Sequence, residues 1–272
     1  MPCYAKLFRM RLYWEVAKRA CQRQLAYRAA NLNGLVTNIC FGYLRAVVFV
    51  AVFQNQTTVA GYDVGQTITY TWLTQALIMV VALWNWWDVE QTIRSGDVVS
   101  DLAKPFSYLG FWLARDYGRA YYFVLFRAAP ILLVGQLTYG VSWPTSPWTW
   151  LAFAISVVLA IATSFAWRFA LNLSAFWTTD TRGLGNLATS VILVLSGFAV
   201  PLPFFPSAVR DVLTLLPFAG IIQVPCDVFL GRLAGPDLLL AVARQALWTI
   251  ALLAGAQLLV GRATRRVVVQ GG

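Results

Sequence analysis

The sequence has no histidine, and only 12% of its 272 residues carry a charge. Histidine is the usual acid–base group near neutral pH and the commonest metal ligand, so both kinds of site lose their usual residue. No glycine-rich GxxxxGK(S/T) loop occurs, which excludes a P-loop nucleotide site. The four cysteines are scattered, without the CxxC spacing of metal or redox motifs. We therefore expect no catalytic residue, metal or cofactor within this chain.

Apolar residues make up 59% of the chain, and the charged fraction is about half of that in soluble domains. Six apolar stretches are each long enough to cross a bilayer, which takes about 20 residues. They cover residues 34–53, 64–87, 118–138, 148–177, 184–200 and 237–260. The sequence therefore predicts an all-α membrane protein with six transmembrane helices.

Lys and Arg are distributed unevenly between alternate loops. With a cytoplasmic N-terminus, fifteen of them fall in cytoplasmic segments, and two, Arg210 and Arg232, fall in external loops. Cytoplasmic loops of membrane proteins carry the excess of positive charge. Both termini and the loop after the second span are therefore predicted to be cytoplasmic.

Residues 1–33 form the first predicted unit, a basic amphipathic helix. Apolar residues recur at helical spacing between Leu7 and Leu25, and basic residues cover much of the remaining surface. A helix of this kind lies in the headgroup plane and contacts anionic lipid. A nucleic-acid-binding arm is the alternative, and direct attachment to a membrane span disfavours it.

Residues 92–105 are a short polar island between the second and third predicted spans. Ser95 is a candidate N-cap of one compact helix, Asp97 occupies its first turn, and Pro105 stops it. Asp97 and Asp101 share one face, and the apolar residues Val98, Val99 and Leu102 share another. Such a helix lies on the bilayer or docks into a partner protein; a solvated connector is the alternative.

Residues 201–235 are too apolar for an ordinary loop. Prolines at 201, 203 and 206 break the fifth helix. Short helical pieces are expected at residues 211–216 and 219–224, with interruptions at Pro217 and Pro225. A re-entrant hairpin in the outer leaflet and an extracellular cap packed on the spans both fit this pattern.

Four arginines lie inside the predicted spans, namely Arg45, Arg127, Arg168 and Arg244. Each costs about 2.5–3.5 kcal/mol to insert unless it meets a cavity, a partner or headgroups. No acidic residue lies within the spans to pair with them, so snorkelling is favoured, most of all for Arg168 and Arg244. The alternative assigns Arg45 and Arg127 to a polar pathway. Thr71 and Gln75 are polar enough to line that pathway or to bond between helices.

Several short motifs occur in a characteristic order. They are IRSGD and DLAKP after the second span (residues 93–97 and 101–105), FW at residues 176–177, LSG at 195–197, and PL, FP, LPF, Pro225 and Gly231 around the hairpin. In order and spacing they resemble the ABC type-2 exporter permeases, the group described as ABC-2 family transporter proteins, over nearly the whole chain. Lys104 precedes Pro105 where the family pattern has Arg, which keeps the charge.

The resemblance implies a six-span permease domain at residues 34–260 and a cytoplasmic tail at 261–272. It further implies a coupling helix at about residues 92–104 and a re-entrant hairpin at about 201–235. The implied ATPase contacts are Ile93, Arg94, Ser95, Gly96, Asp97, Val98, Val99, Asp101 and Leu102. The residues implied near the outer gate are Phe198, Pro201, Leu202, Phe204 and Phe205.

The resemblance also implies partners: two copies of a separate ATPase that binds ATP and Mg, and a second permease, identical or dissimilar. The complex would lie in a bacterial inner (plasma) membrane. Its apolar, aromatic spans favour export of a hydrophobic or amphipathic cargo such as a drug, lipid or peptide. Alternatives are an ion-coupled transporter or channel, for which intramembrane acids or a repeat would be expected, and a non-transporting scaffold.

Overall fold

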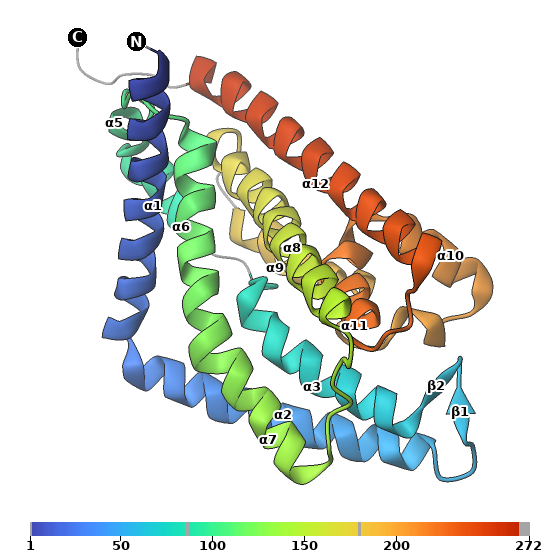
Figure 1. Ribbon diagram of the computed structural model, residues 1–272. Coiled ribbons are helices and arrows are strands. Elements are labelled where there is room, and N and C mark those ends of the chain that lie inside the picture. Colours follow the sequence, from blue (N-terminus) through green and yellow to red (C-terminus); the bar gives the residue numbers. More distant parts are fainter. Residues whose placement is uncertain (1, 85–86, 179–180, 267–272) are drawn as a thin grey trace.

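The computed structural model describes residues 2–84, 87–178 and 181–266, which fold almost entirely into helices (Figure 1). The longer helices are α1 (Pro2–Ala26), α2 (Arg28–Val52), α3 (Val64–Val80), α6 (Tyr108–Phe123), α7 (Ala129–Thr138), α8 (Pro147–Leu173), α9 (Thr181–Leu195) and α12 (Gly235–Ala263). Shorter pieces are α4 (Asp88–Ser95), α5 (Val98–Leu102), α10 (Ser207–Leu215), α11 (Gln223–Phe229) and the single turns η1 (Val124–Ala128), η2 (Ser174–Phe176), η3 (Leu202–Phe204), η4 (Pro217–Gly220) and η5 (Thr264–Arg266). The predicted helical fold class is confirmed.

One small ladder departs from the all-α prediction. Strand β1 (Thr58–Val59) pairs antiparallel with β2 (Tyr62–Asp63). Ala60 and Gly61 between them have φ of +49° and +78°. Positive φ at both central residues is the signature of the tight turn that matches strand twist, so four residues close a hairpin.

Among the described residues, four helices are long and apolar enough to cross a membrane. They cover Ala29–Val52, Tyr108–Thr138, Pro147–Phe176 and Gly235–Ala263, and so match the first, third, fourth and sixth predicted spans. The second predicted span is α3, of 17 residues, and the fifth is the apolar α9, of 15 residues. The structure thus supports an all-α membrane protein, with four spans of full length.

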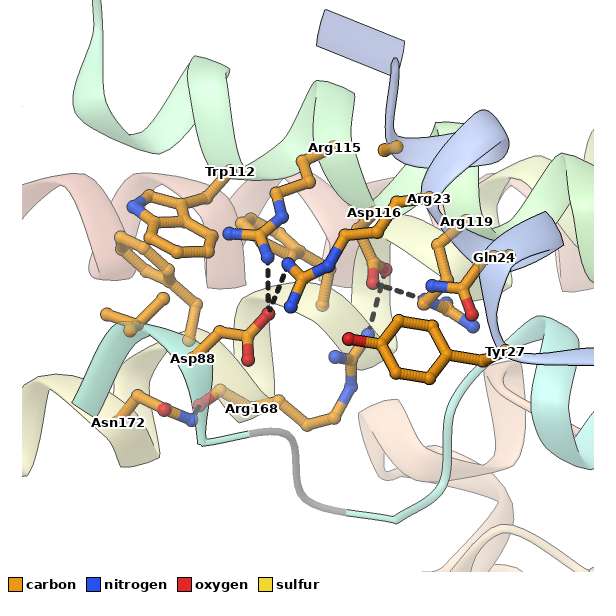
Figure 2. Close-up of a pocket in the computed structure, with 14 residues that line it drawn as sticks. Arg23, Gln24, Tyr27, Asp88, Trp112, Arg115, Asp116, Arg119, Arg168 and Asn172 are labelled. Carbon is orange, nitrogen blue, oxygen red and sulfur yellow. Dashed lines mark hydrogen bonds and ion pairs between the residues drawn. The ribbon is translucent and has the colours of Figure 1, made fainter. Parts of the chain in front are cut away.

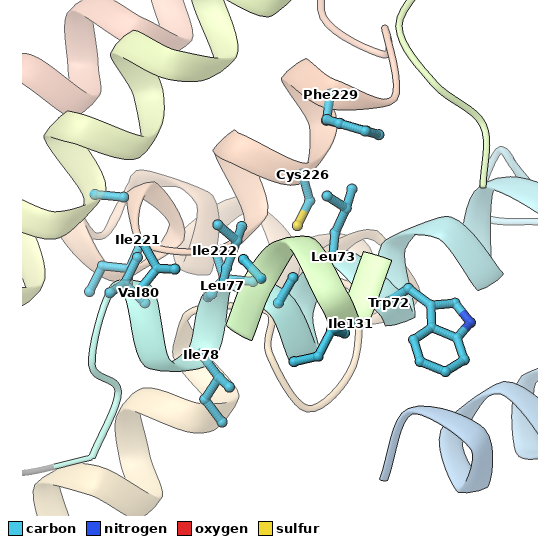
Figure 3. Packing of buried hydrophobic residues seen from close by; sticks show 14 of the residues in the cluster. Trp72, Leu73, Leu77, Ile78, Val80, Ile131, Ile221, Ile222, Cys226 and Phe229 are labelled. Atoms are coloured by element: carbon cyan, nitrogen blue, oxygen red, sulfur yellow. The ribbon is translucent and has the colours of Figure 1, made fainter. Parts of the chain in front are cut away.

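Helix α3 forms the centre of the molecule. Thirteen of its residues are buried, so it is enclosed on all sides by protein. Trp72, Leu73 and Leu77 pack with Ile131 of α7 and Cys226 of α11 in the main apolar cluster (Figure 3). A helix enclosed by its neighbours has little surface left to face lipid.

Both ends of α3 follow from local chemistry. At the start, Asp63 accepts a hydrogen bond from the Gln66 backbone N–H (2.8 Å), and the Gln66 side chain accepts one from the Asp63 N–H (3.3 Å), a capping box. At the other end the backbone reaches φ +50° at Ala82, which stops the helix. The second span therefore ends at Val80 and not at residue 87, as the sequence predicted.

Helix α1 packs along α6, and the chain then turns sharply at Tyr27 into α2 (Figure 1). Gly118 sits at the contact: a Cβ there would overlap the Ala17 carbonyl oxygen. The basic N-terminal helix is therefore docked by close backbone contact on the first part of the 31-residue apolar helix Tyr108–Thr138. At 1.5 Å per residue that helix is about 46 Å long, which is more than enough to cross a ~30 Å hydrocarbon core.

The predicted hairpin between α9 and α12 consists of short helical pieces. Helix α9 ends at Leu195, and Gly197 follows with φ +83°. The first predicted piece corresponds to α10. The second, expected at 219–224, is wrong: η4 ends at Gly220 and α11 begins at Gln223. Pro225 lies in the first turn of α11, where a missing N–H leaves no helical bond unmade, so it does not interrupt the helix.

Candidate functional site

The predicted coupling helix is two short helices, α4 and α5, joined at Gly96. Gly96 has φ +82°, a left-handed conformation that ends α4, and its N–H bonds the Ile93 carbonyl. The α4–α5 segment lies at the end of the molecule where the N- and C-terminal ends of the described chain also lie (Figure 1). Its tip, residues 94–97, is exposed, as are Val99 and Ser100.

The predicted start of this segment is wrong. Ser95 is the last residue of α4 and not the N-cap of a single helix. Its hydroxyl donates to the Asp97 carboxylate at 2.7 Å across the Gly96 turn. The first helix begins at Asp88, because the acidic residues Asp88 and Glu90 favour a helix start and Gly96 favours an end.

The apolar residues of this segment face inward to different extents. Val98 is 3% exposed and packs in a second apolar cluster with Val89, Tyr108 and Phe169. Ile93 and Leu102 are half-buried against the same cluster, whereas Val99 is exposed. Lys104 donates to the Asp101 carboxylate at 2.6 Å, just after the end of α5. The predicted two faces are thus present, and Val99 belongs to the outer one.

Glu90 anchors α4 to the rest of the molecule. Its carboxylate, 2% exposed, accepts hydrogen bonds from Arg94 and from the Thr181 hydroxyl of α9 (2.6 Å). Its backbone N–H donates to the Asn172 side chain of α8 at 3.0 Å. Burial raises the pKa of Glu90, but the hydrogen bonds from Thr181 and Arg94 outweigh it and hold the pKa below its usual value. The ionised Glu90 therefore links α4 to both α8 and α9.

Sequence analysis did not identify Glu90, Asn172 or Thr181 as part of this site. A signal was available: Glu90 and Arg94 lie four apart, the spacing of a helical ion pair, just before the polar island. Their partners on α8 and α9 are distant in sequence, so spacing alone does not connect them.

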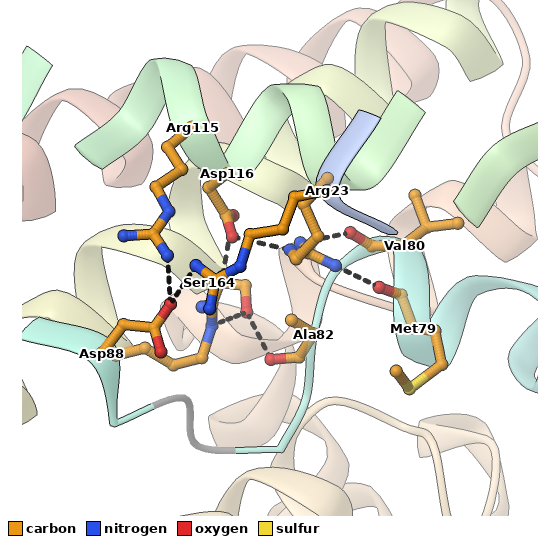
Figure 4. A network of polar contacts seen from close by, with 10 residues as sticks. Arg23, Met79, Val80, Ala82, Asp88, Arg115, Asp116 and Ser164 are labelled. Carbon is orange, nitrogen blue, oxygen red and sulfur yellow. Dashed lines mark hydrogen bonds and ion pairs between the residues drawn. The ribbon is translucent and has the colours of Figure 1, made fainter. Parts of the chain in front are cut away.

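Asp116, Arg119 and Arg168 form a buried triad of charged side chains (Figure 4). Asp116 accepts from Arg119 Nε and from Arg168 Nη2, both at 2.8 Å. Arg119 also donates to the carbonyls of Met79 and Val80 at the end of α3. The prediction that Arg168 snorkels is wrong: it is 5% exposed and ion-paired, because α6 brings Asp116 within reach. The triad joins α3, α6 and α8.

The residues predicted near the outer gate lie together in the hairpin. Leu202 and Pro201 are buried, and Leu202 packs with Leu213 and Ala219. Phe204 makes edge contacts with Phe49 and Tyr62, with centroids 6.0 and 5.7 Å away. Phe198 and Phe205 are half-buried beside them. Within one chain these side chains are packing residues.

Gln223 is the polar centre of that hairpin. Its side-chain oxygen accepts from the Leu202 N–H and the Tyr70 hydroxyl, both at 2.8 Å. Its side-chain nitrogen donates to the Tyr62 hydroxyl (2.9 Å) and to Asp227 (2.8 Å). One buried amide thus fixes the hairpin to α3 and to the β1–β2 ladder. Sequence analysis missed it because its partners outside α11 are 21 to 161 residues away.

No curated protein matches the chain in a sequence search. The family described as "ABC-2 family transporter protein" matches residues 41–271, which include the α4–α5 segment and the hairpin. The chain belongs to the ABC-2 transporter family. The predicted resemblance is confirmed.

As an ABC-2 family member the chain is a permease of an ABC transporter and a multi-pass membrane protein. The family is a transmembrane component without a nucleotide-binding domain of its own. This accounts for a chain that consists mainly of apolar helices, with the polar α4–α5 segment at one end.

Two of the permease's candidate pathway residues, Arg45 on α2 and Thr71 on α3, form hydrogen bonds within the chain. Arg45 donates to Thr74 Oγ1 at 3.0 Å and to the carbonyls of Phe198 and Ala199, just past the end of α9. Its guanidinium also lies over the Phe198 ring, 5.0 Å from the centroid. Thr71 donates to the Thr67 carbonyl within α3 at 2.9 Å. Arg45 therefore links the backbone just after α9 to α2 and α3.

Gln75 is 2% exposed, and its backbone carbonyl accepts a hydrogen bond from the Asn38 side chain of α2 at 3.3 Å. Arg127 lies in η1, a π-helical turn, and is 5% exposed. Gly34 makes room for its guanidinium, which stands 5.6 Å from the Phe123 ring centroid. Among the described residues, Arg127 Nε has no hydrogen-bond partner. Among the described residues neither Arg45 nor Arg127 is ion-paired, but Arg45 donates to three oxygen atoms whereas Arg127 keeps an unsatisfied Nε.

Proposed function

We propose that this permease is the transmembrane subunit of an exporter that is driven by a separate ABC ATPase docked on the α4–α5 segment. The observation that carries the proposal is the combination of an exposed tip at residues 94–97 and a buried anchor at Glu90. A partner that moves the tip would move Glu90, and through it Asn172 of α8 and Thr181 of α9.

The distribution of positive charge supports a cytoplasmic position for this end. Fifteen Lys and Arg fall in segments that share a side with the N-terminus, and two fall in the opposite loops. ATP is available on the cytoplasmic side, so a segment that receives an ATPase belongs there. The hairpin of residues 201–235 is then external, and α1 lies at the cytoplasmic membrane surface beside α6.

We infer that the transport pathway lies between two permeases, identical or dissimilar, because the candidate pathway and gate residues of a single chain are packed against one another. The outer residues Leu202 and Phe204 are packed inside the hairpin, and Arg45 is bonded to backbone. In the proposed mechanism, closure of two ATP-bound ATPases moves the α4–α5 segments, and the two permeases part at the hairpin to release cargo. The apolar and aromatic helices favour a hydrophobic or amphipathic cargo such as a drug, lipid or peptide.

Purification of the chain from its native membrane in a gentle detergent tests the proposal. We expect an ABC ATPase to co-purify in a one-to-one ratio with permease chains, as identified by mass spectrometry. A Gly96→Pro variant, which cannot adopt the left-handed turn at residue 96, is expected to lose the ATPase but keep its membrane insertion. If no ATPase co-purified with the chain from membranes that contain one, the result would favour a scaffold or an ion-coupled transporter.

A further inference from the structure

A cavity of about 250 Å³ lies between α1, α4, α6 and α8, beside the α4–α5 segment (Figure 2). Arg23 enters it from α1, Tyr27 from the turn between α1 and α2, Asp88 from α4, Arg115 from α6 and Arg168 from α8. The cavity is thus bounded by the N-terminal helix, by the first helix of the proposed ATPase contact and by two membrane-crossing helices.

Positive charge is in excess in this cavity. The charged residues that line it are Arg23, Arg115, Arg119, Arg168, Asp88 and Asp116. Four guanidinium groups against two carboxylates leave a surplus of two positive charges. A partly enclosed surplus of this kind attracts an anion more strongly than the same charges in open water.

Each of the two carboxylates faces two arginines, so each cluster keeps one surplus positive charge: Asp116 pairs with Arg119 and Arg168, and Asp88 pairs with Arg115 and Arg23. The Asp88 cluster is the more accessible of the two, because the side chains of the Asp116 triad are buried. Arg23 stands 3.7 Å from Asp88, and its side chain is 53% exposed. In the part of the chain that the structure describes, Arg115 hydrogen-bonds through one guanidinium nitrogen, and its carbon lies 4.6 Å from the Trp112 ring centroid.

The size and shape of the cavity select the ligand. Pockets for drug-sized molecules are about 300–1,000 Å³, so this one suits a smaller group. The planar fork of a guanidinium matches the oxygens of a phosphate and binds them in pairs. Tyr27 and Trp112 at the cavity are the side chains that favour the boundary between lipid and water.

We propose that this cavity binds a phosphate group, carried by an anionic lipid headgroup or free in solution, between Arg23 of α1 and Arg115 of α6. The bound phosphate ties the N-terminal helix to the α4–α6 region and so sets how firmly α1 is held while the α4–α5 segment moves. Binding is a property of the isolated chain, so its test does not depend on the proposed ATPase.

The test uses the purified full chain in nanodiscs of phosphatidylcholine, with or without phosphatidylglycerol. A second arm adds inorganic phosphate to the phosphatidylcholine sample, against chloride at equal ionic strength. The thermal unfolding midpoint and native mass spectrometry report binding. The variants are Arg23→Gln and Arg115→Gln. Arg19→Gln is the matched control, because Arg19 is exposed on the same helix but does not line the cavity.

We expect phosphatidylglycerol or inorganic phosphate to raise the midpoint of the unaltered chain and of Arg19→Gln. In Arg23→Gln and Arg115→Gln the apparent Kd should rise about tenfold, since each loses a charge-assisted hydrogen bond. A response to phosphatidylglycerol alone identifies the lipid, and a response to inorganic phosphate identifies the free anion. No response in either arm, or equal weakening in Arg19→Gln and the exposed Arg23→Gln, would overturn the proposal.

Discussion

Reversal of the two acidic charges on the α4–α5 segment, Asp97→Lys with Asp101→Lys, is expected to uncouple transport from ATP hydrolysis while membrane insertion stays intact. Asp97 accepts the Ser95 hydroxyl across the Gly96 turn, and Asp101 accepts Lys104. The variant removes both bonds and brings a lysine at 101 against Lys104. The variant also changes the charge of the proposed docking surface from negative to positive at two positions. Mismatched charges across an interface cost several kcal/mol, so we expect ATPase association to weaken about a hundredfold.

The measurement is ATPase activity that depends on reconstitution with the permease, together with membrane yield of each variant. The neutral pair Asp97→Asn and Asp101→Asn should have an intermediate effect, because it removes the negative charges but keeps an acceptor oxygen and adds no repulsion. Asp237→Lys is the control: Asp237 is exposed at the start of α12, far along the helix from the α4–α5 end (Figure 1). Unchanged coupled activity in the double reversal, or an equal loss in Asp237→Lys, would contradict docking at α4–α5.

Asp116→Ala is expected to cause the largest loss of stability of any single substitution discussed here. It leaves Arg119 and Arg168, both at least nine-tenths buried, without their carboxylate. Removal of one partner of a buried ion pair costs about 3–5 kcal/mol, because the remaining charge is uncompensated. Thermal unfolding in detergent measures the effect.

Two further variants separate this mechanism from a general sensitivity of the fold. Asp116→Leu combined with Arg168→Met removes both charges and should recover much of the loss, since Arg119 keeps the Met79 and Val80 carbonyls. Asp211→Ala removes an exposed pair with Arg210 and should change stability by less than about 1 kcal/mol. If Asp116→Ala were no more destabilising than Asp211→Ala, the triad would not be a structural element.

The sequence was most informative where the pattern is long. Four of the six predicted spans match full-length apolar helices, because twenty apolar residues have one stable arrangement in a bilayer. The second and fifth were predicted too long. Local backbone at Ala82 and Gly197, both at positive φ, ends α3 and α9 early, and neither conformation follows from hydropathy.

The position of the candidate site in the sequence was predicted, but its division into two helices was not. The polar island at 92–105 marks the α4–α5 segment, yet Ser95 ends a helix that it was predicted to begin. Gly96 was the available sign of two helices, because glycine favours the left-handed end of a helix. The anchor at Glu90 could not be derived, since its partners lie 82 and 91 residues away.

The arginines show the limit of reasoning from one span at a time. Arg168 was expected to snorkel because no acidic residue lies within any predicted span, but its partner Asp116, just before the third span, lies 52 residues earlier on α6. Arg45 is bonded to the carbonyls beyond α9, 153 and 154 residues away. Buried ionic contacts of this kind depend on how helices pack, and packing is not visible in the hydropathy of either partner.

Reconstitution into vesicles tests the central claim most directly. Vesicles would hold the permease alone, the co-purifying ATPase alone, or both, with ATP and a fluorescent amphipathic dye as the probe. The account predicts that the permease alone neither hydrolyses ATP nor concentrates the dye, and that hydrolysis stimulated by the permease requires both proteins. Uphill accumulation of the dye, or ATP hydrolysis, by vesicles that contain this chain and no second protein would contradict it.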